Sequence, residues 1–185
     1  IIQSYSLKFK NNINYSIVRF GNVVGSSGSV IPLFLKQIQN KEPVTITHPK
    51  VERYFMSLSE AASLIIETTN MEDNGSIYVL EMGDRIKILE IAKKLIKISG
   101  FTEKNENNPE GDIEIKYIGL QPGEKINEEL YTGELIKTSN HNIYICKEKL
   151  LDSEKIDNVI NDINANIENL NEERIGKILK EICEI

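Results

Sequence analysis

Arginine is scarce in this sequence. Of the 22 basic residues only four are arginines, and no two of them are neighbours in the chain. Because lysine carries most of the positive charge, each arginine is a candidate for a specific role. Acidic residues number 28, so the net charge is −6. An acidic chain repels nucleic acid unless it has a local basic patch, and we therefore expect no nucleic-acid partner.

Histidine and cysteine are rarer still, with two of each. Two histidines are too few for most metal sites, and Cys146 and Cys183 match no metal-ligand or redox spacing. We therefore predict no metal site. His48 precedes Pro49, and no carboxylate lies at a spacing that would indicate an acid–base pair. This favours a structural role for His48 over acid–base chemistry.

Long apolar runs are also missing. No segment is apolar enough and long enough to cross a membrane, so we expect no membrane contact by this chain and a cytoplasmic location. The 40% hydrophobic content argues against disorder, and 185 residues suffice for one compact domain with a core. The charge is uneven, since residues 152–185 carry nine acidic and four basic side chains, a net charge of −5.

Hydrophobic periodicity predicts alternating strands and helices. Strands are expected at 15–20, 44–47, 53–56, 77–80, 113–117 and 143–146. Helices are expected at 1–7 with a stop at Asn11–Asn12, at 30–39, from a Ser57–Glu60 capping box to about 69, and at 88–99. Residues 21–29 and 102–111 are expected to be loops. The alternation indicates an α/β class, and two further amphipathic helices predict an acidic helical hairpin at 152–185.

The first candidate site is the small-residue loop 21–29, which leads into a helix. Unpaired N–H groups at a helix N-terminus, here near Ser29 and Val30, attract phosphate, and Asn22 adds a neutral donor. The alternative is a flexible connection that Ser29 merely caps. The loop has neither G-x-G-x-x-G nor the phosphate-loop lysine.

Two charged residues are further candidates. Arg53 lies between apolar segments, and its planar fork suits a diphosphate, although it can equally pair with Glu52 or another surface carboxylate. Glu124 lies in a Pro-Gly-Glu turn, where a rigidly held carboxylate can accept two sugar hydroxyls. By spacing alone, a glutamate that merely favours a helix N-terminus is the stronger interpretation of Glu124.

Several motifs in register resemble those of one family, the polysaccharide-biosynthesis (CapD-like) nucleotide-sugar 4,6-dehydratases. They are Val18–Phe34, Pro43–Pro49, Arg53–Met56, Tyr78–Gly83, Lys87–Ile88 and Pro122–Lys125. The resemblance extends from Ile1 to about Leu151. It therefore divides the chain into residues 1–151, which resemble the dehydratases, and residues 152–185, the helical hairpin.

The resemblance implies an extended short-chain dehydrogenase/reductase. Such enzymes bind NAD(P) on a doubly wound, Rossmann-like sheet and act on a UDP-sugar such as UDP-N-acetylglucosamine. It also implies that the glycine-rich cofactor loop and the catalytic lysine helix precede the segment like Ile1–Phe9. We therefore expect the C-terminal half of a dehydratase, without catalytic residues and inactive by itself. Its expected partners are a missing N-terminal half, which in many relatives carries membrane helices, and further copies in a homo-oligomer.

The family's binding residues can be carried over one at a time. Asn22 is expected near the phosphates, Thr45 and Thr47 at the uracil, Arg53 at the diphosphate and Glu124 at the ribose hydroxyls. The family usually has arginine before Pro-Gly-Glu, whereas this chain has Gln121. Either Arg53 alone supplies the positive charge at the diphosphate, or affinity is weaker.

Two other functions remain open at this point. The same family framework serves nucleotide-sugar epimerases and reductases, and dehydration needs an extra acid/base pair that this segment does not supply. The other alternative is a non-catalytic sugar-nucleotide-binding or assembly module. An exposed sheet edge has unpaired backbone groups that can pair with another chain.

Overall fold

The computed structural model describes residues 1–9, 13–26, 28–71, 73–149, 153–167 and 171–183. They group into two compact units. The first comprises Ile1–Val18, Glu67–Val79 and Thr132–Ile185, and the second comprises Arg19–Ile66 and Leu80–Tyr131. Both units contain helices and strands, which confirms the α/β class. The boundary predicted at 151 lies outside the described residues, and the C-terminal helices are grouped with the first unit.

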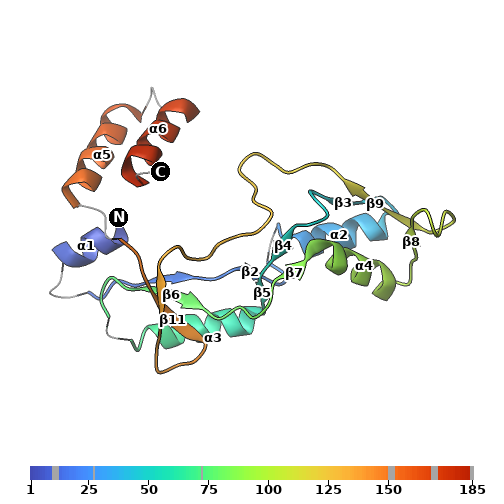
Figure 1. Ribbon diagram of the computed structural model, residues 1–185, viewed down its shortest axis with the longest axis horizontal. Helices are drawn as coiled ribbons and strands as arrows, with labels where there is room; N and C mark the ends of the chain where they lie inside the picture. Colours follow the sequence, from blue (N-terminus) through green and yellow to red (C-terminus); the bar gives the residue numbers. More distant parts are fainter. Residues whose placement is uncertain (10–12, 27, 72, 150–152, 168–170, 184–185) are drawn as a thin grey trace. The chain divides into compact units, whose positions relative to one another are not determined.

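The first unit contains most of a four-stranded sheet with the strand order β1–β6–β11–β10 (Figure 1). The strands are β1 (Ile17–Arg19), β6 (Ile77–Leu80), β11 (Ile143–Lys147) and β10 (Glu134–Lys137). All four residues of β6 are buried, as is typical of an inner strand covered on both faces. β10 and β11 are antiparallel, with Leu135 opposite Cys146.

The helices of the first unit are α1 (Ile2–Lys8), α5 (Ser153–Ala165) and α6 (Glu172–Cys183). α5 contacts both α1 and α6, so the two C-terminal helices predicted from their apolar spacing are confirmed in the described part of the chain. Lys8 of α1 forms an ion pair with Asp157 of α5. None of the described helices is both long and apolar enough to cross a membrane.

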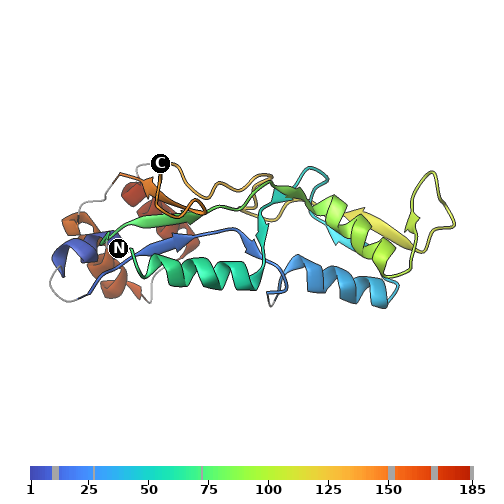
Figure 2. The ribbon, with the colours of Figure 1, turned by 90° about the horizontal axis from the view of Figure 1, so that it is seen from below.

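The second unit has its core between two helices and a short sheet (Figures 1 and 2). α2 (Val30–Gln39) and α4 (Ile88–Ile98) contact each other, and both contact β3 (Val44–Ile46). β3 pairs in parallel with β9 (Ile113–Tyr117), which pairs with β8 (Glu103–Lys104), so β3 is an edge strand. The buried core consists of Phe34, Ile38, Val44, Ile46, Val51, Ile88, Ala92, Ile96 and Ile113.

Short strand pairs complete the second unit. β2 (Asn22–Val23) runs parallel to β5 (Phe55–Met56), and β4 (Glu52–Arg53) pairs with β7 (Ile86–Lys87) in antiparallel fashion. The prediction of continuous loops at 21–29 and 102–111 was therefore wrong, since β2 and β8 lie inside them. Two-residue strands depend on a partner distant in sequence, which periodicity cannot reveal.

α3 (Leu58–Thr68) begins at the predicted capping box. The backbone N–H of Glu60 donates to Ser57 Oγ, and the backbone N–H of Ser57 donates to Glu60 Oε2 at 2.8 Å. The two residues thus satisfy each other's polar groups, as their spacing in the sequence predicts.

Candidate functional site

A cavity of about 280 Å³ in the second unit brings together most of the predicted site residues. Six of the eight line it: Asn22, Val30, Thr45, Thr47, Arg53 and Glu124. Ser29 and Gln121 are not among the lining residues. Apolar side chains from α2, β3 and α4 form much of the remaining wall. The volume is close to the lower limit of about 300 Å³ for small-molecule pockets, so it suits part of a nucleotide sugar.

β3 explains why two threonines reach this cavity. Val44 and Ile46 are buried in the core, whereas Thr45 and Thr47 are only half-buried. Side chains alternate between the faces of a strand, so residues two apart lie on the same face. The sequence Val-Thr-Ile-Thr therefore anchors the strand with its aliphatic residues and presents two hydroxyls to the cavity.

The Pro-Gly-Glu turn holds the Glu124 carboxylate in place. The Glu124 backbone N–H donates to the carbonyl of Gln121, and the Gln121 backbone N–H donates to Glu124 Oε2 at 3.0 Å. Gly123 has φ +80°, a conformation that glycine adopts without strain. The Thr47 hydroxyl donates to Glu124 Oε1 at 2.8 Å. Gln121 thus contributes its backbone, while the residue itself is exposed.

Arg53 is the charged centre of the site, and only 7% of it is exposed. Its Nη1 donates to the carbonyls of Glu52 and Ile126 at 2.9 Å each. Nη2 lies 3.2 Å from Glu124 Oε1, and Nε lies 3.1 Å from Glu128 Oε1. Of the alternatives left open by the sequence, pairing with carboxylates is what the structure shows, but with Glu124 and Glu128. The three side chains together carry a net charge of −1.

Three of the four arginines in the sequence hold the segment that follows the Pro-Gly-Glu turn. Arg53 donates to the carbonyl of Ile126, Arg85 Nη2 to that of Glu128 at 3.1 Å, and Arg19 Nη1 to that of Leu130 at 3.5 Å. The guanidinium of Arg85 also lies 4.9 Å from the ring centroid of Tyr54. The rare arginines therefore fix the irregular segment that positions Glu124 and Glu128. Sequence analysis missed Arg19 and Arg85, although their scarcity was a signal.

The N-terminus of α2 is the remaining predicted element. Ser29 occupies the N-cap position, as predicted, but its side chain makes no capping hydrogen bond. Its Oγ is buried and has no hydrogen-bond partner among the described residues. Gly28 and Val30, on either side of Ser29, line the cavity. The N-terminal turn of α2 thus borders the cavity through Gly28 and Val30, and the Ser29 hydroxyl between them lacks a partner among the described residues.

Gln37 was not found by sequence analysis. Its Nε2 lies 2.9 Å from Thr45 Oγ1, and its Oε1 accepts the Thr45 backbone N–H at 3.2 Å. Gln37 lies on α2 and is not among the residues that line the cavity. No motif marks a glutamine in the middle of an amphipathic helix, and the contact arises only when α2 packs beside β3.

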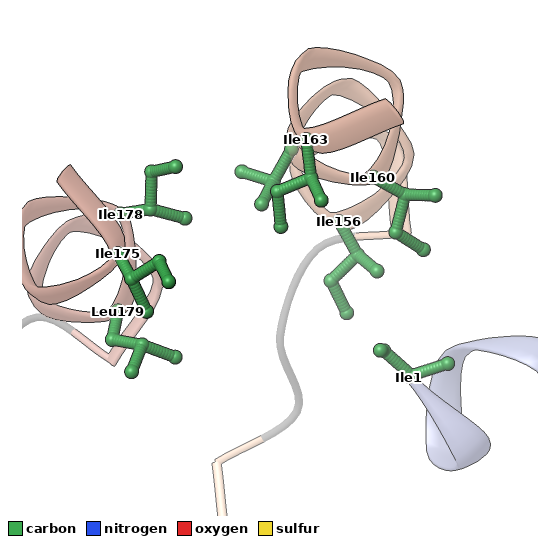
Figure 3. Close-up of a pocket in the computed structure, with 8 residues that line it drawn as sticks. Ile1, Ile156, Ile160, Ile163, Ile175, Ile178 and Leu179 are labelled. Carbon is green, nitrogen blue, oxygen red and sulfur yellow. The ribbon is translucent and has the colours of Figure 1, made fainter. Parts of the chain in front are cut away.

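A second cavity and His48 show fewer features of a ligand-binding site. The second cavity, of about 280 Å³ and in the first unit, is lined by aliphatic side chains of Ile1, α5 and α6 that face one another (Figure 3). Without polar groups, this cavity cannot orient a polar ligand.

His48 Nδ1 accepts the backbone N–H of Lys50 at 3.2 Å, as a turn residue does. Within the described residues, no group of three or more His, Cys, Asp or Glu side chains could hold a metal ion.

Comparison with known proteins adds a close relative in sequence. The chain is 38% identical over 180 residues to the capsular polysaccharide biosynthesis protein CapD of Staphylococcus aureus. The match covers 96% of this chain and 28% of that protein. The chain thus spans less than a third of the length of this relative.

Two solved structures share its fold. The structure of Pen from Bacillus thuringiensis superposes with a TM-score of 0.67 at 28% identity, covering 87% of this chain and 53% of that one. The dTDP-glucose 4,6-dehydratase of Bacillus anthracis, solved in complex with NAD, gives a TM-score of 0.51 at 14% identity. That match covers 65% of this chain and 36% of the dehydratase, and it shows the fold alone.

A family model described as polysaccharide biosynthesis protein matches residues 1–149, which include every residue of the candidate site. The fold is that of the extended short-chain dehydrogenase/reductases, of which the chain covers a part. The chain belongs to the polysaccharide biosynthesis protein family.

Proposed function

We propose that the chain is the substrate-binding half of a UDP-sugar 4,6-dehydratase, of the UDP-N-acetylglucosamine type, that acts in surface-polysaccharide synthesis. The observation that carries this proposal is the convergence of Asn22, Val30, Thr45, Thr47, Arg53 and Glu124 on one cavity. These residues come from four separate segments of the sequence. Membership of the polysaccharide biosynthesis family supports the proposal independently.

Each wall of the cavity suits one part of a UDP-sugar. The Thr45 and Thr47 hydroxyls face the pyrimidine and its ribose, and Glu124 accepts hydrogen bonds from ribose hydroxyls. The first turn of α2, with Ser29 and Val30, offers the partial positive charge of a helix N-terminus to the phosphates, beside Asn22. Arg53 supplies the buried positive charge that pairs with the Glu124 carboxylate and holds it in place.

Catalysis needs groups beyond those of this cavity. NAD supplies the hydride acceptor and donor in a 4,6-dehydration, and the sequence has no G-x-G-x-x-G loop to hold it. We therefore assign none of these residues to the cofactor and none to acid–base chemistry. The 185 residues are expected to bind the UDP-sugar without converting it. The missing N-terminal half, a homo-oligomeric parent and a cytoplasmic location belong to the same proposal.

Calorimetry on the full chain tests the binding role. UDP and UDP-N-acetylglucosamine are expected to bind, whereas free N-acetylglucosamine is not, because the recognised groups belong to the nucleotide. Proton NMR of the same mixtures is expected to show no 4-keto sugar. Failure of both nucleotides to bind would overturn the binding role, and a 4-keto product from these residues alone would contradict their lack of catalytic groups.

A further inference from the structure

The side-chain amide of Gln37 has only one orientation that fits its contacts. The backbone N–H of Thr45 can only donate, so the atom that receives it must be the amide oxygen, at 3.2 Å. The other end of the amide is then the NH₂ group, which can only donate, and it lies 2.9 Å from Thr45 Oγ1. The contact also satisfies a backbone N–H on β3, the edge strand of its sheet.

This orientation leaves the hydroxyl proton of Thr45 free for another partner. Because Thr45 Oγ1 accepts a hydrogen bond from Gln37, its own proton is not used in that contact. Thr45 lines the cavity, so the proton can be donated to a ligand there. Thr47 has the opposite polarity, because its hydroxyl donates to the Glu124 carboxylate, which can only accept. The cavity wall therefore presents a donor at Thr45 and an acceptor at Thr47.

We propose that Gln37 is a positioning residue that makes the cavity select a ligand with a hydrogen-bond acceptor opposite Thr45. The inference rests on the proposed function and specifies it. Uracil and cytosine differ at position 4 of the ring, where uracil has a carbonyl oxygen and cytosine has an amino group. A threonine hydroxyl whose proton is free to donate favours the carbonyl, whereas an amino group there can reach only the remaining lone pair of Oγ1 and leaves the hydroxyl proton without an acceptor. Gln37 thus selects UDP-sugars over CDP-sugars without touching either.

The variant Gln37→Glu inverts this polarity with almost no change of shape. One carboxylate oxygen still accepts the Thr45 N–H, but the other can only accept, so the Thr45 hydroxyl must donate to it. The lone pairs of Thr45 Oγ1 then face the cavity. We expect UDP to bind about tenfold more weakly at neutral pH while CDP binds as well as before or better, about the effect of one hydrogen bond.

Matched variants separate this effect from added charge and from lost stability. Gln39→Glu makes the same change two residues further along α2, at an exposed position, and is expected to leave the ratio of UDP to CDP affinity unchanged. Thr45→Val removes the hydroxyl and is expected to lower the ratio by itself. In the Thr45→Val background, Gln37→Glu should have no further effect on the ratio of UDP to CDP affinity, because the Thr45 hydroxyl through which Gln37 acts is absent.

Calorimetric titration of the full chain and its variants with UDP and CDP decides the matter. A wild-type preference for UDP that falls in Gln37→Glu, but not in Gln39→Glu, supports the inference. Equal wild-type affinities, or an unchanged ratio in folded Gln37→Glu, would overturn it and leave the binding function standing. If Gln37→Glu does not fold, an unchanged ratio in Thr45→Val overturns it instead. Absence of UDP binding by the wild type would overturn the proposed function itself.

Discussion

Glu124 Oε1 lies 3.2 Å from Nη2 of Arg53 and also accepts the hydroxyl of Thr47. A single carboxylate oxygen thus joins the buried guanidinium to the cavity wall. Glu128 contacts the same guanidinium through Nε but is not among the cavity-lining residues. The two glutamates therefore share one partner and differ in their access to a ligand.

That difference predicts a different result for each glutamate. Glu124→Gln keeps the size of the side chain but replaces one acceptor oxygen by a donor, so we expect UDP to bind about tenfold more weakly, as for the loss of one charged hydrogen bond. Glu128→Gln weakens the interaction with Arg53 by a similar amount. It is nevertheless expected to change the affinity for UDP by no more than about twofold. Calorimetry on both variants checks this, and equal losses would contradict a direct role for Glu124.

Two serines at helix N-termini allow a second comparison. Ser57 makes capping hydrogen bonds at α3, whereas Ser29 makes none at α2. We expect Ser57→Ala to lower the free energy of unfolding by about 1 kcal/mol, the usual loss for an N-cap. Ser29→Ala is expected to cost less than about half of this, because no capping bond is lost.

The two serines are expected to differ in ligand binding in the opposite sense. Ser29→Ala removes a buried hydroxyl between the cavity-lining Gly28 and Val30 and is expected to weaken UDP binding by several fold, while Ser57→Ala leaves it unchanged. Chemical denaturation and calorimetry on the same two proteins give both readouts. A stability loss in Ser29→Ala as large as that in Ser57→Ala would show that Ser29 acts as a cap after all.

The capping box at α3 also predicts a dependence on pH. The hydroxyl and backbone N–H of Ser57 donate to the Glu60 carboxylate and lower the pKa of Glu60 below its ordinary value. Because the pKa is lower in the folded state, ionised Glu60 stabilises α3 at neutral pH. That contribution is lost as the pH falls through the folded-state pKa of Glu60.

Carbon-13 NMR of the Glu60 carboxyl group measures this directly. In Ser57→Ala the hydroxyl donor is gone, so the pKa of Glu60 is expected to rise toward its ordinary value while the backbone contact remains. An unchanged titration midpoint in that variant would mean that the Ser57 hydroxyl does not bind the carboxylate in solution.

The sequence predicts features that depend on neighbouring residues better than features that depend on contacts between distant segments. The capping box of α3 and the apolar period of α4 lie within single segments, and both helices were predicted. β10 was missed because Glu134–Lys137 becomes a strand only by pairing with β11. Six of the cavity-lining residues were named from family motifs and from the expected helix N-terminus, but the contacts that orient them were not predicted. Gln37 and Thr45 meet only when α2 packs on β3, and the carboxylate partners of Arg53 lie more than 70 positions away.

Gln121 provides the last prediction, because it stands where the family usually has arginine. Arg53, Glu124 and Glu128 together carry a net charge of −1, which disfavours a diphosphate. Gln121 is exposed beside Glu124, and its backbone N–H already binds that carboxylate. Gln121→Arg is therefore expected to tighten binding of UDP-sugars by about three- to tenfold at low salt, the gain of a partly screened charge pair.

Salt and a matched variant distinguish this local effect from a change in overall charge. Raising the ionic strength to about 1 M shortens the screening length to roughly 3 Å, so most of the gain should disappear. Gln39→Arg adds the same charge to an exposed position on α2 and is expected to give less than a twofold gain. Calorimetric titration with UDP-N-acetylglucosamine at two salt concentrations tests both points. Equal gains in the two variants would contradict a phosphate contact from position 121 and would leave the positive end of α2 as the main attraction for the diphosphate.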